Sequence, residues 1–171
     1  MNQFCQLVKK AIEIYILDGK TLDVPQKLSA EFKKKAGVFV TIYNRKELRG
    51  CIGTYQPTKQ NLAKEIIDNA VSAVTNDWRF SPITKEELAE LSYEVSVLEK
   101  PEQIEDIREL DPKKFGIIVQ GINGRKSALL LPNLDGLDTI EKQLSACCQK
   151  AGISPTQEQI VIFRFKTEKY N

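Results

Sequence analysis

Apolar side chains recur along the chain with two different spacings, and the wider spacing predicts helices. It is clearest near the start of the chain, at Phe4, Leu7, Val8, Ala11, Ile12, Tyr15 and Ile16. Residues three and four apart share one face of a helix, so we expect an amphipathic helix over about residues 3–17. The same spacing returns over residues 59–75, where Thr58 is the expected N-cap, and again between a capped start at Thr139 and Gly152.

Runs rich in β-branched and aromatic residues, or alternating between apolar and polar, predict strands. Residues 38–43 form one such run, the polar residues 44–47 turn the chain, and residues 48–54 return as the second strand of a hairpin. Further strands are predicted at residues 92–98, in a second hairpin at 115–131, and at 159–165. The order helix, hairpin, helix, strand, hairpin, helix, strand indicates an α+β fold with a mostly antiparallel sheet.

The composition is that of an ordinary globular protein and disfavours several classes of partner. With 171 residues the chain is long enough for one domain, or for two small lobes that share a core. A net charge of +2 is too small to indicate nucleic acid or an anionic membrane. No apolar run approaches the ~20 residues of a membrane span, and the first residues lack the apolar core of a signal peptide. We therefore expect a cytoplasmic protein without a nucleic-acid or membrane partner.

Histidine is absent and the cysteines are scattered, which limits the chemistry available. The lack of histidine excludes a Ser-His-Asp triad, a Cys-His pair and every histidine metal centre. The four cysteines form no C-x-x-C pair and are expected to be reduced thiols: Cys5, Cys51, Cys147 and Cys148. No cofactor and no transition-metal site is predicted, although carboxylates could hold Mg²⁺ or Ca²⁺ weakly.

The stretch Leu48–Thr54 combines a cation, a thiol, a hydroxyl and two glycines in seven residues. Cys51 is a candidate nucleophile if a nearby positive charge lowers its pKa, and in a regular strand Arg49 shares its face. A bulge at Gly50 would break that arrangement. The alternative is that Cys51 is a small core residue. Arg49 is either a ligand for carboxylate or phosphate, or an ordinary exposed strand residue.

A second polar segment, residues 76–82, contains the only tryptophan of the chain. In one interpretation Trp78 and Phe80 close the edge of the core while Asp77 and Arg79 pair locally. In the other, the loop faces the bend at Cys51 and forms one wall of a pocket. The residues alone leave both open.

Several segments together resemble the AMMECR domain family, which includes protein A of the AmmeMemoRadiSam system. The resemblance is strongest at Leu48–Thr54, the LRGCIG motif and its flanking threonine, and it covers roughly residues 1–170. It is also carried by residues 37–41, 62–73, 76–80, 94–98, 101–102, 129–132 and 134–152. The chain departs from the family pattern at Trp78, where proline is usual, so the conformation of that loop stays open.

The resemblance implies an α+β fold in which helices flank an antiparallel sheet of about five strands. It also implies a smaller second lobe, with a cleft near the signature hairpin. It further implies an association, in prokaryotes, with a Memo-like protein and a radical SAM protein. It implies no particular reaction.

Two hypotheses follow. In the first, the protein is an enzyme or enzyme component of that system, with Cys51 as the catalytic residue of the cleft. A small anionic ligand would then be bound by the remaining candidates: Arg49, Gly50, Thr54, Asp77 and Arg79. In the second, the protein is a non-catalytic interaction module in which Cys51 is a structural core thiol.

Overall fold

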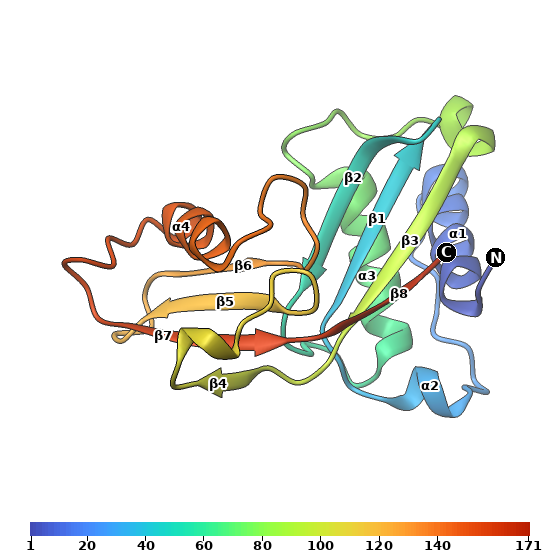
Figure 1. Cartoon of the computed structure of the whole chain (residues 1–171). Helices are drawn as coiled ribbons and strands as arrows, with labels where there is room; N and C mark the ends of the chain where they lie inside the picture. The colour runs from blue at the N-terminus through green and yellow to red at the C-terminus, as the bar shows by residue number, and fades with distance from the viewer. The chain divides into compact units, whose positions relative to one another are not determined.

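Two four-stranded sheets, one in each half of the fold, carry the helices (Figure 1). The computed structural model describes residues 1–171. The chain divides into two compact units, the first made of Met1–Val97 with Glu168–Asn171 and the second of Leu98–Thr167. Strand order is β2-β1-β3-β8 in one sheet and β4-β7-β5-β6 in the other.

The first unit holds the signature hairpin. Its strands are β1 (Val38–Asn44), β2 (Glu47–Thr54), β3 (Leu91–Leu98) and β8 (Thr167–Tyr170). Its helices are α1 (Gln3–Asp18), α2 (Ala30–Lys33), α3 (Leu62–Thr75) and the 3₁₀ helix η1 (Lys85–Glu90). Strand β1 pairs antiparallel with both β2 and β3.

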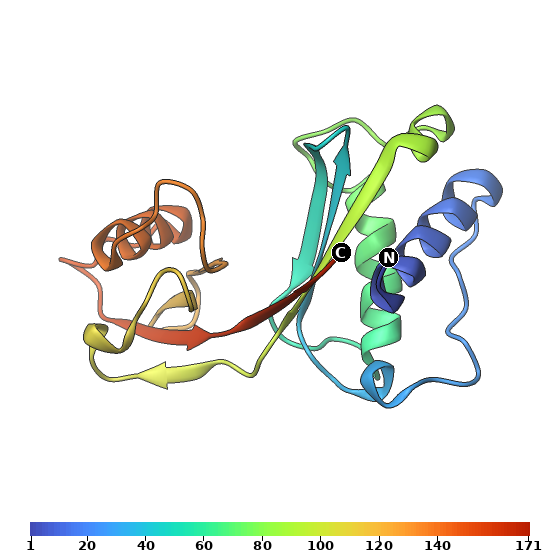
Figure 2. The same ribbon diagram turned by 45° about the vertical axis from the view of Figure 1, so that its right-hand side comes forward.

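The core of this unit lies between the sheet and helices α1 and α3, which cover the same face of the sheet (Figure 2). Alternate residues of β1, namely Val38, Val40 and Ile42, point into that core and are fully buried. Their neighbours Phe39, Thr41 and Tyr43 therefore point to the other face. No helix of the first unit covers this second face, so the polar residues on it are the ones to consider for a site.

The second unit has its own core, between one face of its sheet and helix α4. Its elements are β4 (Glu102–Ile104), the 3₁₀ helix η2 (Ile107–Glu109), β5 (Gly116–Gly121), β6 (Ser127–Leu130), α4 (Ile140–Ala151) and β7 (Ile160–Phe165). Thr139 caps α4 by accepting from the Lys142 N–H, and Gly152 ends it in the left-handed conformation, as expected. Cys147 and Cys148 are both buried in this core.

The predicted α+β class, with antiparallel sheets flanked by helices, is confirmed. The strands are divided between two sheets of four, where a single sheet of about five was expected. Helix α3 begins at Leu62 with Asn61 as its N-cap, so the prediction of Thr58 as the cap was wrong. Thr58 instead donates through both its N–H and its hydroxyl to the carboxylate of Glu65.

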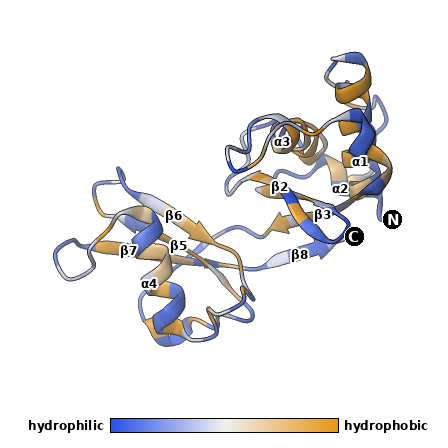
Figure 3. Ribbon diagram, turned by 90° about the horizontal axis from the view of Figure 1, so that it is seen from above, coloured by the Kyte–Doolittle hydropathy of each residue, from blue (hydrophilic) through white to orange (hydrophobic).

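Two strands, β4 and β8, were not predicted from the sequence, and their length and hydropathy explain why. Figure 3 shows β8 as hydrophilic along its length, and β4 is only three residues long. Neither offers the apolar run from which a strand is predicted. None of the helices has the length and apolar character needed to cross a bilayer.

Candidate functional site

The signature strand β2 lies at the edge of its sheet and contains a bulge at Arg49. Gly50 pairs with Ile42 and Leu48 pairs with Tyr43, so Arg49 is an extra residue without a partner in β1. A bulge interrupts the alternation of side chains between the two faces of a strand. Arg49 and Cys51 therefore lack the shared face that a regular strand would give them. The bulge lies one residue before Gly50, the position considered from the sequence.

The guanidinium of Arg49 is bound within the protein. Its Nε and Nη2 donate to the two carboxylate oxygens of Glu87 at 2.7 and 2.9 Å, and its Nη1 donates to the Ser81 carbonyl at 2.8 Å. The hydrogen bonds from Arg49 to Glu87 are the main cause that lowers the pKa of Glu87 to about 2. The Arg49 side chain is only 16% exposed. Arg49 thus braces the bulge against η1, and an anionic ligand would have to displace Glu87 to reach it.

The loop after α3 holds the backbone of Cys51. The Cys51 N–H donates to Asp77 Oδ2 at 2.8 Å, and Arg79 Nη2 donates to the Cys51 carbonyl at 3.4 Å. Arg79 also binds both oxygens of Asp77, and this is the main cause that lowers the pKa of Asp77 to about 2. Strand β2 would otherwise present open backbone groups at this edge. Asp77 and Arg79 close it.

The same loop exposes its tryptophan. The expected local pairing of Asp77 with Arg79 is confirmed. The expectation that Trp78 closes the edge of the core was wrong, because this side chain is 90% exposed. Phe80 is half-buried, and the Arg79 guanidinium lies 5.3 Å from the centre of its ring. With Asp77 anchored to β2, the chain turns Trp78 outward.

The thiol of Cys51 lies on the sheet face that α1 and α3 leave uncovered. Its Sγ is 3.2 Å from Thr41 Oγ1, its direct partner in β1. Cys51 is half-buried, whereas Cys5, Cys147 and Cys148 are buried. Burial raises the pKa of the Cys51 thiol, and the opposing effects of Thr41 and Arg79 are smaller. The thiol is therefore protonated at neutral pH.

Thr54 belongs to the other face of the strand. It pairs with Val38, and its hydroxyl donates to Glu65 Oε1 at 2.7 Å. Glu65 is 1% exposed and also accepts from the Lys59 N–H. Thr54 and Glu65 thus fix the segment that follows the signature. Thr54 is separated from Cys51 by the sheet itself.

The two glycines of the signature permit close packing. A Cβ on Gly50 would lie 2.4 Å from the Ala73 carbonyl oxygen of α3, and one on Gly53 would lie 2.4 Å from the ring of Phe39. Gly50 therefore lets the edge strand approach the helix backbone. Its position on the helix face separates it from the thiol.

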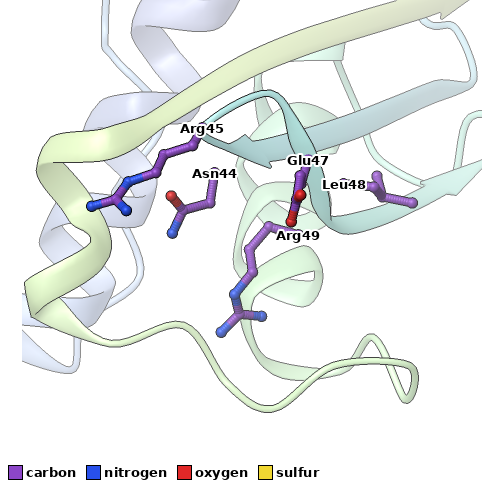
Figure 4. A pocket seen from close by; sticks show the side chains of 5 residues that line it. All are labelled: Asn44, Arg45, Glu47, Leu48 and Arg49. Atoms are coloured by element: carbon purple, nitrogen blue, oxygen red, sulfur yellow. The ribbon is translucent and has the colours of Figure 1, made fainter.

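An open pocket of about 390 Å³ lies beside the hairpin turn (Figure 4). It is lined by Asn44, Arg45, Glu47, Leu48 and Arg49. In Figure 4 the two arginines leave the hairpin in different directions, and each pairs with a glutamate of η1. Asn44 also donates to Glu87. The pocket's cations and amide are thus already bound within the protein.

The structure adds residues that the sequence did not single out. Thr41 pairs with Cys51 on one side and with Glu94 on the other, so all three lie on one face of the sheet. Tyr43 shares this face, and Lys169 of β8 binds Glu94 Oε1 at 3.1 Å. The β-branched and aromatic run at residues 38–43 and the alternation along residues 92–98 predicted these strands, but the register that joins them is not visible in the sequence. No group of three or more Cys, Asp or Glu side chains is arranged to hold a metal ion.

Comparison with known proteins gives one consistent match. The AMMECR1 family model matches residues 5–170. A Thermotoga maritima protein is 46% identical over 163 residues, which cover 94% of this chain and 92% of that protein. A Clostridium acetobutylicum protein is 40% identical over 171 residues, covering 99% of this chain but 36% of its own length. The crystal structure of an uncharacterized Pyrococcus horikoshii protein superposes with a TM-score of 0.86 at 36% identity, covering 97% of this chain and 88% of that one.

Proposed function

Because the chain belongs to the AMMECR1 family, we propose that it is an enzyme component that works with Memo-like and radical SAM proteins. The resemblance of its motifs to that family suggests these partners. The Clostridium relative supports a role beside another protein, because the matched region is 36% of a longer chain there. The sheet face around Cys51 would hold the substrate.

The observation that carries this proposal is the setting of Cys51. It is the one cysteine of the four that is not buried, and its pairing with Thr41 puts it on the face that α1 and α3 leave uncovered. Its backbone is fixed by Asp77 and its sulfur lies against Thr41. A thiol held in one position on a partly exposed residue is suited to contact a substrate. Since its pKa is raised, it would meet the substrate as a hydrogen-bond donor and react only after losing its proton.

An anionic substrate group would be bound by Arg79. Arg49 uses Nε, Nη1 and Nη2 on Glu87 and Ser81. Arg79 uses Nε and Nη2 on Asp77 and Cys51, and its Nη1 has no partner in the protein. The Arg79 side chain is also 41% exposed. We therefore assign the anion contact to Arg79 and a bracing role to Arg49.

Reconstitution tests the proposal. The chain would be combined with purified Memo-like and radical SAM proteins and a small-molecule cell extract, and conversion of extract components would be followed by mass spectrometry. We expect conversion to be lost in Cys51→Ala and kept in Cys148→Ala, a cysteine variant in the second unit. Unchanged thermal unfolding of Cys51→Ala would show that the loss is chemical. Full conversion by a folded Cys51→Ala protein would overturn the proposal.

A second candidate function, a non-catalytic interaction module, is favoured by Trp78. A tryptophan that is 90% exposed on a loop anchored by Asp77 resembles the aromatic anchors of protein interfaces. Binding of the purified Memo-like protein would be measured by calorimetry for Trp78→Ala and Cys51→Ala. A module predicts at least a tenfold loss of affinity in Trp78→Ala and none in Cys51→Ala, together with no conversion in the reconstitution above.

A further inference from the structure

Four polar side chains form one row across the first sheet. Cys51 of β2 pairs with Thr41 of β1, and Thr41 pairs with Glu94 of β3. Lys169 of β8 completes the row with its Nζ 3.1 Å from Glu94 Oε1. Direct cross-strand partners point to the same face, so the thiol, hydroxyl and carboxylate lie on the face opposite the helices, where the ammonium contacts the carboxylate. Each of the four strands contributes one group.

The contacts in this row are arranged by charge. The neutral Thr41 hydroxyl touches the sulfur at 3.2 Å, and the carboxylate lies beyond it, with its ammonium partner outermost. Neighbouring strands are ~4.8 Å apart, which places Glu94 about 10 Å or less from Cys51. That separation is comparable to the Debye length of about 10 Å at 0.1 M salt, so the charge of Glu94 is only partly screened from the thiol.

The surroundings of this row complete the description of the thiol's electrostatics. Besides Thr41 and Glu94, Tyr43 faces the thiol from β1, and Asp77 and Arg79 face it from the loop after α3. A second hydroxyl on the same face, that of the fully buried Ser96, has no hydrogen-bond partner. Ser96 thus lies on the same face of the sheet as the thiol and is packed there without a polar contact.

We propose that Glu94, held by Lys169, is a positioning residue that adds to the effect of burial in keeping the Cys51 thiol protonated until a ligand reaches this face. The inference rests on the proposed function of Cys51. A carboxylate disfavours a second negative charge nearby, so Glu94 opposes the thiolate, while Lys169 offsets part of this effect. A ligand that brings a positive charge, such as an amine, over Glu94 would lower the barrier to losing the thiol proton. Burial is the main cause that raises the pKa of the Cys51 thiol; the charges of Asp77 and Glu94 act in the same sense, and Thr41 and Arg79 act against it.

The test is the rate of Cys51 alkylation against pH, read by peptide mass spectrometry in variants of the row. Glu94→Gln removes the negative charge, so its profile is expected at lower pH, with a severalfold faster rate at pH 7.5. Lys169→Met leaves Glu94 without its partner, and its profile is expected at higher pH. Thr41→Val removes the hydroxyl contact that favours the thiolate, so its alkylation profile is also expected at higher pH. Thr41→Ser keeps a hydroxyl at this position, so its profile is expected to match that of the wild type.

A matched control separates charge from folding. Glu13→Gln neutralises a carboxylate of α1, on the helix side of the sheet, and leaves the Cys51 profile where it is. A folded Glu94→Gln protein whose profile superposes on the wild type would overturn the inference. That failure is distinct from failure of the proposed function, which is read from conversion by Cys51→Ala and not from the alkylation profile.

Discussion

The carboxylate of Asp77 accepts the Cys51 N–H at the open edge of β2 and at the same time binds Arg79. Its side chain is 3% exposed and its pKa is lowered from 3.8 to about 2, mainly by the hydrogen bonds from Arg79. A folded-state pKa below the unfolded value means that ionised Asp77 stabilises the fold above pH ~4. This stabilisation is lost as the pH falls through the folded-state pKa.

We therefore predict that acid weakens the wild type more than Asp77→Asn. Ionised Asp77 contributes about 2 kcal/mol at pH 7, of which about 1 kcal/mol is lost by pH 3. Urea unfolding at pH 7 and pH 3 measures both values. Glu87 has a similarly lowered pKa, so the double variant Asp77→Asn, Glu87→Gln is expected to show an even flatter pH dependence. Equal acid losses in wild type and both variants would contradict this explanation.

The carboxylate of Glu65 is the second residue on which the signature region depends. It is 1% exposed and accepts hydrogen bonds from Thr54, from the N–H and hydroxyl of Thr58, and from the Lys59 N–H. Glu65→Ala would leave these donors without an acceptor, at an expected cost of about 3 kcal/mol or more. Glu65→Gln turns one amide NH₂ toward donors and is expected to cost about 2 kcal/mol.

Denaturant unfolding at pH 7 measures these losses. Asp68→Asn is the matched control on the same helix, because Asp68 forms only partly exposed ion pairs with Lys59 and Lys64. We expect it to change stability by less than about 1 kcal/mol. A Glu65→Gln protein as stable as this control would mean that the hydrogen bonds to Glu65 contribute little.

At the scale of elements, the packing of β2 on α3 depends on a missing side chain. A Cβ at Gly50 would stand 2.4 Å from the Ala73 carbonyl oxygen, and backbone cannot yield as a flexible side chain does. Gly50→Ala is expected to destabilise the protein by about 2 kcal/mol, within the range found for overpacked cores. Gly121→Ala in β5 is the control, since its nearest contact is at 3.4 Å. Thermal unfolding of the two variants compares them, and equal losses would argue against a clash at α3.

The elements also show what the sequence can and cannot predict. The apolar stripe of α1 and the β-branched and aromatic run of β1 predicted their elements nearly residue by residue, because each depends on its own side chains. The start of α3 was misplaced because Thr58 is bound by Glu65, seven residues further along. Whether Arg49 and Cys51 share a face stayed open for a similar reason: one extra residue in β2 reverses the faces, and only the register against β1 reveals it.

The same distinction holds for the candidate site. Residues near one another in the chain, such as Asp77 and Arg79, were predicted to pair and do. The row that joins Cys51 to Glu94 spans three strands, and its members are up to 53 positions apart before β8 is added. Such groups are brought together by sheet register, which no local pattern encodes. The exposed Trp78 likewise depends on how Asp77 is anchored, and not on its own hydrophobicity.

At the scale of the whole molecule, each unit has its own buried cluster and its own buried thiol. Cys5 lies in the first cluster and Cys147 in the second, and both are fully buried. Each sulfur therefore reports when its own core opens. We predict that Ile12→Ala, in the first cluster, lowers the urea concentration at which Cys5 is alkylated and leaves that of Cys147 in place. Removing a fully buried Ile side chain costs about 2–5 kcal/mol, which corresponds to a shift of roughly 1–2 M urea.

A variant in the second core tests the same prediction in the opposite direction. Ile117 is fully buried in the second cluster. Ile117→Ala is therefore expected to lower the urea concentration at which Cys147 is alkylated and to leave that of Cys5 unchanged. Peptide mass spectrometry reads both thiols in one sample, so each acts as the internal control for the other. If either substitution lowered the urea concentration for alkylation of both thiols by the same amount, the two cores would be one cooperative folding unit. Separate shifts would mean that the unit carrying Cys51 can open while the other stays folded, and each core could then be stabilised or weakened without the other.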